Sequence, residues 1–213
     1  MKRLFITCGL FTVVAAVAFI LTIHDFLTIT QRVPADILVV EGWAYNSPAI
    51  AEAAEEFRRG GYRVLITVGP PATVGGRVSE RVSSALLAAD QLQRRGIEKQ
   101  SIVALPVPDA AQHRTYSSAL LVKKWLKRSG ESAQGINVFT IGPHARKSLV
   151  LFTRALGPAY PIGVISGTDS DYDPNRWWMS ARGLYVMARK VVGYVYAITW
   201  PLPDEIPMDI SLA

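Results

Sequence analysis

The sequence predicts an α/β protein: a doubly wound, mostly parallel five-stranded sheet with helices on both faces, preceded by one transmembrane helix. Two observations predict this architecture. The first is a run of twenty residues without a charge near the N-terminus, Leu4 to Ile23. The second is the alternation, along the rest of the chain, of short apolar runs rich in β-branched residues with longer helical patterns.

The N-terminal apolar run has the length of a membrane span. As a helix it measures roughly 30 Å, the thickness of the hydrocarbon core of a bilayer. Lys2 and Arg3 precede it, which predicts a cytoplasmic N-terminus and a main domain on the outer face of the inner (plasma) membrane. Ala15 to Ala18 resembles a signal-peptidase site, but the apolar run continues beyond it. We therefore expect an uncleaved anchor, with a cleaved signal as the alternative.

Composition bounds the remaining chain to one domain. We expect an anchor over residues 1–24, a linker over 25–35, one α/β domain over 36–200 and a loose tail over 201–213. The single cysteine, Cys8, lies in the anchor, so the domain has no internal disulfide and no multi-cysteine zinc site. The net charge is +6, and the basic residues are scattered along the helices. They are typical of solvated helix faces; attraction to anionic headgroups or to a phosphorylated ligand is the alternative.

Strands and helices alternate in order. Five apolar runs fit strands buried on both faces of a parallel sheet, at residues 36–40, 62–68, 101–105, 136–141 and 161–165. Helical patterns lie between them, at residues 47–59, 79–95, 115–128 and 143–156. A last helix is predicted from Asp173 to about Trp200. Its apolar end favours a packed terminal helix, with docking at the membrane interface as the alternative, since Tyr194, Tyr196 and Trp200 suit an interface.

The carboxyl ends of the predicted strands supply the candidate site, because ligands of open parallel sheets bind there. His144 and Arg146 are the most informative residues, since cations are disfavoured in the first turn of a helix unless an anion binds beside them. Thr115 opens a helix and is equally compatible with a simple cap, and Glu80 with a partner of the helix dipole. The predicted ligand-binding residues are Glu41, Gly42, Gly69, Arg114, Thr115, Ser118 and Arg146, and the predicted acid–base residues are Glu80 and His144.

Other chemistry finds no support in the motifs. The acidic stretch from Asp169 resembles a calcium loop, but Pro174 and Ser180 occupy the glycine and glutamate positions. The sequence contains no phosphate-loop lysine motif, dinucleotide fingerprint or hydrolase serine elbow. No histidine pair has metal-ligand spacing, and no motif for nucleic-acid recognition occurs. We predict no metal site and no nucleic-acid partner, and the cofactor is unknown.

The order of these pieces resembles the ElyC/SanA/YdcF family of bacterial envelope-associated α/β domains. The resemblance covers Asp36 to Val195 and rests on segments 36–42, 68–70 with 79–80, 115–119 and 144–157. It implies roles for Glu80, Thr115 and His144. The chain departs from the family pattern at Trp43, at the prolines after the second strand and at Ser118, where the family has asparagine. Proline removes an amide donor, so the departures predict an altered cradle for phosphate or nucleotide.

Together these observations predict a single-pass membrane protein of cell-envelope biogenesis, acting on peptidoglycan or polysaccharide precursors. Its outer domain would bind or process a phosphorylated glycan-lipid or related anionic intermediate, and whether it is an enzyme is left open. The expected partners are membrane lipid, a phosphorylated lipid carrier or nucleotide sugar, and proteins of envelope synthesis. The alternatives are a non-catalytic scaffold or binding module, and a protein that binds a nucleotide or S-adenosylmethionine.

Overall fold

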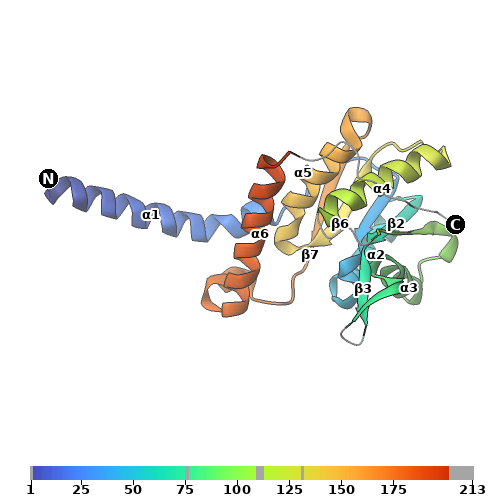
Figure 1. Cartoon of the computed structure of the whole chain (residues 1–213), viewed down its shortest axis with the longest axis horizontal. Coiled ribbons are helices and arrows are strands. Elements are labelled where there is room, and N and C mark those ends of the chain that lie inside the picture. Colours follow the sequence, from blue (N-terminus) through green and yellow to red (C-terminus); the bar gives the residue numbers. More distant parts are fainter. Residues whose placement is uncertain (1, 75–76, 109–112, 131, 202–213) are drawn as a thin grey trace.

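The computed structural model describes residues 2–74, 77–108, 113–130 and 132–201, and within these ranges the side chains of residues 2–9, 74, 77 and 80 are not described. A long N-terminal helix, α1 (Lys2–Leu27), projects from an α/β body (Figure 1). The tail predicted over 201–213 lies, apart from Pro201, outside the described residues.

The body is built on a five-stranded sheet in which every neighbouring pair is parallel. The strand order is β5-β2-β1-β6-β7, which is the doubly wound, Rossmann-like arrangement. The strands are β1 (Ile37–Glu41), β2 (Val64–Gly69), β5 (Ile102–Pro106), β6 (Ile136–Ile141) and β7 (Ile162–Gly167). β1 and β6 are buried along their whole length, as expected for central strands covered on both faces. The predicted fold class is confirmed.

Helices cover both faces of the sheet, and alternate residues of β1 divide between two cores. Ile37 and Val39 face a core shared with α4 (Arg114–Ser129) and α5 (Ala145–Leu156). Leu38 and Val40 face a second core, shared with α2 (Ala49–Arg59) and α3 (Ser84–Arg94). Short 3-10 turns complete the framework: η1 (Gly42–Asn46), η2 (Lys99–Ser101), η3 (Gly142–His144) and η4 (Gly157–Ala159).

The helix predicted from Ser79 to Arg95 is wrong in its first turn and a half. Here the chain forms an antiparallel hairpin of β3 (Pro71–Val74) and β4 (Arg77–Ser83) before α3 begins. The Ser79 hydroxyl accepts hydrogen bonds from the amides of Arg81 and Val82, a local turn that competes with helix formation. Ser83 is the true cap, because its hydroxyl accepts from the Leu86 amide at 3.2 Å.

The predicted last helix is also divided. The 3-10 turn η5 (Pro174–Met179) is followed, after Ser180, by α6 (Ala181–Thr199). Asp173 caps the turn, and Ser180 caps the helix by accepting from the Gly183 amide at 3.0 Å. Each of these two caps begins an element of its own, so the chain forms a 3-10 turn and a helix where a single helix was predicted.

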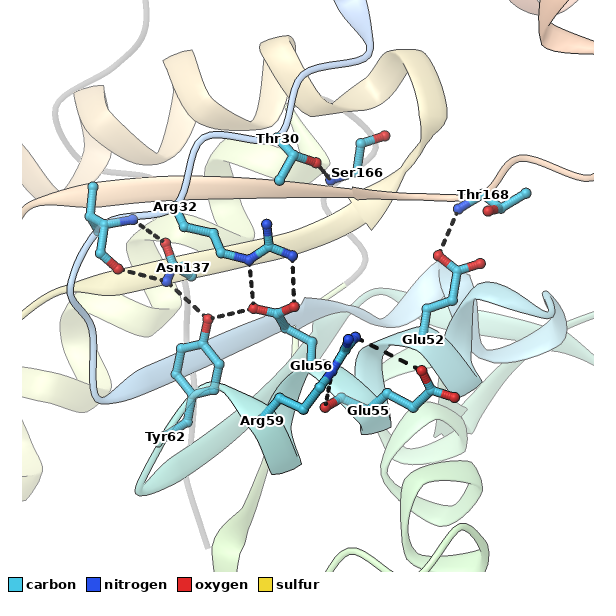
Figure 2. A network of polar contacts seen from close by, with 11 residues as sticks. Thr30, Arg32, Glu52, Glu55, Glu56, Arg59, Tyr62, Asn137, Ser166 and Thr168 are labelled. Carbon is cyan, nitrogen blue, oxygen red and sulfur yellow. Dashed lines mark hydrogen bonds and ion pairs between the residues drawn. The ribbon is translucent and has the colours of Figure 1, made fainter.

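The segment between α1 and β1 is tied to the body by a polar network in which Glu56, Tyr62 and Asn137 are buried and Arg32 is exposed (Figure 2). Arg32 binds both carboxylate oxygens of Glu56 at 2.9 and 2.8 Å, and the Tyr62 hydroxyl donates to the same carboxylate. The Asn137 amide exchanges hydrogen bonds with the backbone of Val33 and donates to the Tyr62 oxygen at 2.9 Å. Asn137 on β6 thus connects the linker to Tyr62, which lies between α2 and β2, and Arg32 connects the linker to α2.

Asn137→Leu is expected to lower the free energy of unfolding by about 3 kcal/mol, because it leaves several buried polar groups unpaired. Chemical unfolding of the detergent-solubilised full chain measures this effect. Asn175→Leu, at an exposed position of η5, is the matched control and should change stability by less than about 0.5 kcal/mol. Equal losses in the two variants would show that the network does not stabilise the linker.

Candidate functional site

The strand order places a switch point between β1 and β6. From β1 the chain builds the sheet toward β2 and β5, and later from β6 toward β7 in the opposite direction. The connections leaving these two central strands diverge, which opens a crevice beyond their carboxyl ends. Glu41 is the last residue of β1, and the turn containing His144 follows β6 directly.

A cavity of about 550 Å³ occupies this crevice. Six residues predicted from sequence line it together: Glu41, Gly69, Arg114, Thr115, Ser118 and His144. Trp43 and Lys147 contribute further walls, and α6 closes the cavity on another side with Arg182, Tyr185, Arg189 and Lys190. Thr115 and His144 therefore line the same cavity.

Glu41 is held as a buried anion. Its Oε2 accepts a hydrogen bond from the Ser148 hydroxyl at 2.6 Å, and its Oε1 lies 3.7 Å from His144 Nε2. Burial alone would raise the pKa of this carboxyl, but His144 and the Ser148 hydrogen bond outweigh burial and help lower the pKa to about 2. Glu41 is therefore ionised at neutral pH.

His144 lies at the centre of the polar cluster. Lys190 Nζ is 3.3 Å from its Nδ1, and Thr115 Oγ1 is 3.3 Å from its Nε2. Because an ammonium group only donates, Nδ1 must accept, and the ring proton of the neutral imidazole is then on Nε2, facing Thr115 and Glu41. Burial and the charge of Lys190 outweigh Glu41 and lower the pKa of His144 to about 4, so the ring is neutral at neutral pH.

Positive charge exceeds negative charge in the cavity wall. Lys190 Nζ lies 4.8 Å from the centre of the Trp43 ring, and burial lowers its pKa to about 8. Burial also lowers the pKa of Lys147. Among the described residues, neither lysine forms an ion pair with a carboxylate, whereas Arg182 pairs with Asp171. Two largely buried ammonium groups without a carboxylate partner suit an anionic ligand.

Three predicted residues lie elsewhere or have another role. Arg146 is outside the cavity: its guanidinium lies 4.0 Å from the centre of the Phe26 ring and donates to the Phe26 carbonyl. Gly42 does not line the cavity either. A Cβ there would lie 2.7 Å from the backbone of Ser84, so glycine lets η1 approach the start of α3. Glu80 belongs to β4 instead of a helix start, and its side chain is outside the described part.

The principal residues missed from sequence are Lys190 and its neighbour at the site, Lys147. Lys147 was visible near a helix start, but Lys190 follows no strand and the strand-end rule cannot reach it. The signal that could have found it is a lysine within the mostly apolar stretch from Val186 to Tyr196. Such a charge in a helix packed on the body requires either a partner or a ligand.

The site predicts a pH dependence of stability. The folded His144 stays neutral down to about pH 4, whereas the unfolded side chain takes up a proton below about 6.5. The unfolded state therefore binds more protons in this window, and stability falls as the pH decreases from 6.5 to 4, by at most about 1.4 kcal/mol per pH unit. His144→Gln should flatten this part of the profile, measured by denaturant unfolding at pH 6.5, 5.5 and 4.5. Parallel profiles of variant and wild type would contradict the assignment.

Fold and site together define a class: a Rossmann-like α/β protein with a cation-rich cavity at its switch point and one helix, α1, long and apolar enough to cross a membrane. Within the described residues, no group of three or more histidine, cysteine, aspartate or glutamate side chains could hold a metal ion. Comparisons with protein-family models, curated proteins and solved structures found no match.

Proposed function

We propose that this chain is a single-pass membrane protein with a cytoplasmic N-terminus, whose outer domain binds a phosphorylated glycan-lipid or a related anionic intermediate of cell-envelope biogenesis. The observation that carries the proposal is the pair Lys147 and Lys190, which line a polar cavity without a carboxylate partner among the described residues. Lys2 and Arg3 before α1 support the orientation.

The donors around the cavity match a phosphate group. The Lys190 ammonium and the Thr115 hydroxyl flank His144 from either side. Arg114 and Thr115 also begin α4, a 16-residue helix whose N-cap residue, His113, makes no side-chain capping hydrogen bond. The N-terminus of a helix favours an anion through its dipole and its backbone amides. Phosphate oxygens can accept from all these groups at once, with charge-assisted hydrogen bonds.

Two further features support the membrane and envelope part of the proposal. α1 keeps its substrate-binding body beside a bilayer, where lipid-linked intermediates are found. The resemblance to the ElyC/SanA/YdcF family points to the bacterial envelope, and the shared motif positions Thr115 and His144 lie 3.3 Å apart in the cavity. Trp43, where the chain departs from the family pattern, places its ring over the Lys190 ammonium and narrows the access of a ligand to it.

The contact between Glu41 and His144 favours a second candidate function, chemical processing of the bound ligand. A phosphate dianion would raise the pKa of His144 and let it carry a proton that Glu41 stabilises. Glu41→Gln separates the two functions. Turnover of a lipid pyrophosphate that is lost in this variant, with unchanged affinity, would establish processing; absence of turnover in the wild type would leave binding alone.

Binding itself is tested with the full chain in lipid nanodiscs. Undecaprenyl phosphate should bind, and undecaprenol, which has the same chain without the phosphate, should bind at least about tenfold more weakly, since one charged hydrogen bond contributes about 1.5–3 kcal/mol. Thr115→Val should weaken phosphate binding by about tenfold or more through loss of one hydrogen bond to the charged phosphate, which contributes about 1.5–3 kcal/mol. Equal affinity for phosphate and alcohol would contradict the proposal.

A further inference from the structure

The junction between α1 and the body leaves no flexible spacer. Ile23 and Leu27, at the end of α1, are buried in a cluster with Tyr172, Trp177 and Met187. The linker that follows α1 comes only after this docking. Ile20 also packs against this cluster, so the part of α1 before the docked residues, Leu4 to Phe19, has 16 residues and measures roughly 24 Å, most of the hydrocarbon thickness of a bilayer. A bilayer spanned by α1 therefore lies directly against the body.

α6 is the element of the body at this boundary. Figure 1 shows it running across the direction of α1, at the end of the body from which α1 projects. The two helices are in contact, because the rings of Phe26 and Tyr194 meet edge to face at 5.4 Å. α6 thus lies roughly parallel to the surface of any membrane that α1 spans.

The outward face of α6 is apolar. Leu184, Ala188, Val192 and Val195 follow one another at intervals of four, four and three residues, so they form a single stripe along the helix. All four are exposed, and Val192 is 68% exposed. A solvated helix of a globular domain has its polar residues on this face, with the apolar stripe turned to the core.

Aromatic and basic side chains border this stripe. Tyr185, Tyr196 and Trp200 are exposed along it, and such residues concentrate at the boundary between lipid and water. The Arg189 guanidinium lies 5.4 Å from the centre of the Tyr185 ring, at the level where anionic headgroups would lie. The composition of the face thus matches a lipid interface rather than water.

We propose that α6 lies in the interface of the bilayer spanned by α1, with the stripe Leu184, Ala188, Val192 and Val195 among the upper acyl chains. The docking at Leu27 fixes the height of α6, and the orientation of the helix presents the stripe to the lipid. Because a bilayer spanned by α1 already places lipid against this face, a second copy of the chain could bind there only by displacing that lipid.

The position of α6 also indicates how the ligand enters the cavity, an inference that rests on the proposed function. A shallow depression of about 420 Å³ lies on the outer face of α6, lined by Ala188, Arg189, Val192, Gly193 and Tyr196. It shares Arg189 and Gly193 with the polar cavity. The two hollows therefore border the same turn of α6, so a lipid could place its phosphate in the cavity and its chain along the apolar face without leaving the membrane.

Depth-dependent fluorescence quenching tests the position of α6 without any ligand. In a Cys8→Ala background, Val192→Cys carries an NBD label, and the full chain is reconstituted into vesicles of phosphatidylethanolamine and phosphatidylglycerol. The matched control is Leu86→Cys, an exposed apolar position on α3, at the end of the body opposite α1 in Figure 1. We expect doxyl-labelled lipid to quench the label at 192 several-fold more strongly than the label at 86.

Equal quenching at the two positions would overturn the proposal. Efficient disulfide cross-linking between unlabelled Val192→Cys chains in the same vesicles would also overturn it, by showing that a second copy covers the face. Because no ligand is present, the outcome is separate from the undecaprenyl phosphate experiment. Quenching at 192 combined with absent phosphate binding would reject the proposed function and leave the membrane position of α6 standing.

Discussion

Replacing Lys147 and Lys190 together with methionine is expected to weaken the binding of undecaprenyl phosphate by about 100-fold, because two charge-assisted hydrogen bonds of about 1.5–3 kcal/mol each are lost and only part of that loss is recovered by solvent. Methionine keeps the apolar stem of each side chain, so packing against Trp43 is preserved. Affinity is measured by titration of nanodisc-embedded full chain.

The Lys147→Met/Lys190→Met variant should also be at least as stable as the wild type when no ligand is bound. Burial lowers the pKa of both lysines, which means that their charged forms are held at a cost in the empty site. A structural lysine would instead stabilise the fold. A marked loss of stability in the double variant would therefore assign Lys147 and Lys190 to the framework.

Lys99→Met/Lys127→Met is the matched control, since both lysines are exposed and the change in net charge is the same. It should leave affinity within about twofold of the wild type, because exposed charges act weakly through screened solvent. An equal loss of affinity in both double variants would show that the effect is only the general attraction between a basic protein and an anionic lipid.

Phe152→Ala is expected to reduce the free energy of unfolding by about 3–5 kcal/mol, the largest stability effect predicted for this chain. Phe152 is completely buried on α5, in the core that joins α4 and α5 to the sheet. Its removal leaves a cavity that a helix packed on a rigid sheet cannot fill. The melting temperature should fall by roughly 10 °C, since 1 kcal/mol corresponds to about 2–4 °C in a domain of this size.

Leu86→Ala serves as the control for this change, because Leu86 is 43% exposed on α3 and should alter stability by less than about 0.5 kcal/mol. Calorimetry of the detergent-solubilised chain compares the two variants. A drop of less than 1 kcal/mol in Phe152→Ala would mean that the core between α5 and the sheet is not packed as described.

The sheet was predictable because its strands carry a strong and simple signal. Ile37–Glu41 and Ile136–Ile141 are buried along their full length, and continuous apolar runs of this kind are typical of parallel strands covered on both faces. The hairpin of β3 and β4 was missed because Arg77–Ser83 mixes valines with serines and arginines, and Ser79 looks like a helix cap. The start of α3 is set by the hydrogen bond that the Leu86 amide donates to the Ser83 hydroxyl.

The site residues that follow the ends of strands could be predicted from the sequence. The residues that reach the site through the packing of helices could not. Glu41, Thr115 and His144 meet because parallel strands end at the same edge of the sheet. Arg146 was expected beside His144, but two residues along a helix turn a side chain by about 200°, toward Phe26 instead of the cavity. Lys190 could not be placed, because it reaches His144 through the packing of α6 against α5 and η3, a long-range contact that no local pattern encodes.

Binding of a lipid phosphate in the cavity is tested by a crystal structure of the full chain grown from a lipidic phase that contains undecaprenyl phosphate. We expect the phosphate inside the cavity, within hydrogen-bond distance of Lys190 Nζ and Thr115 Oγ1, with the prenyl chain leaving along α6 past Val192. A lipid phosphate bound elsewhere on the protein, with none in the cavity, would show that the cavity is not the binding site.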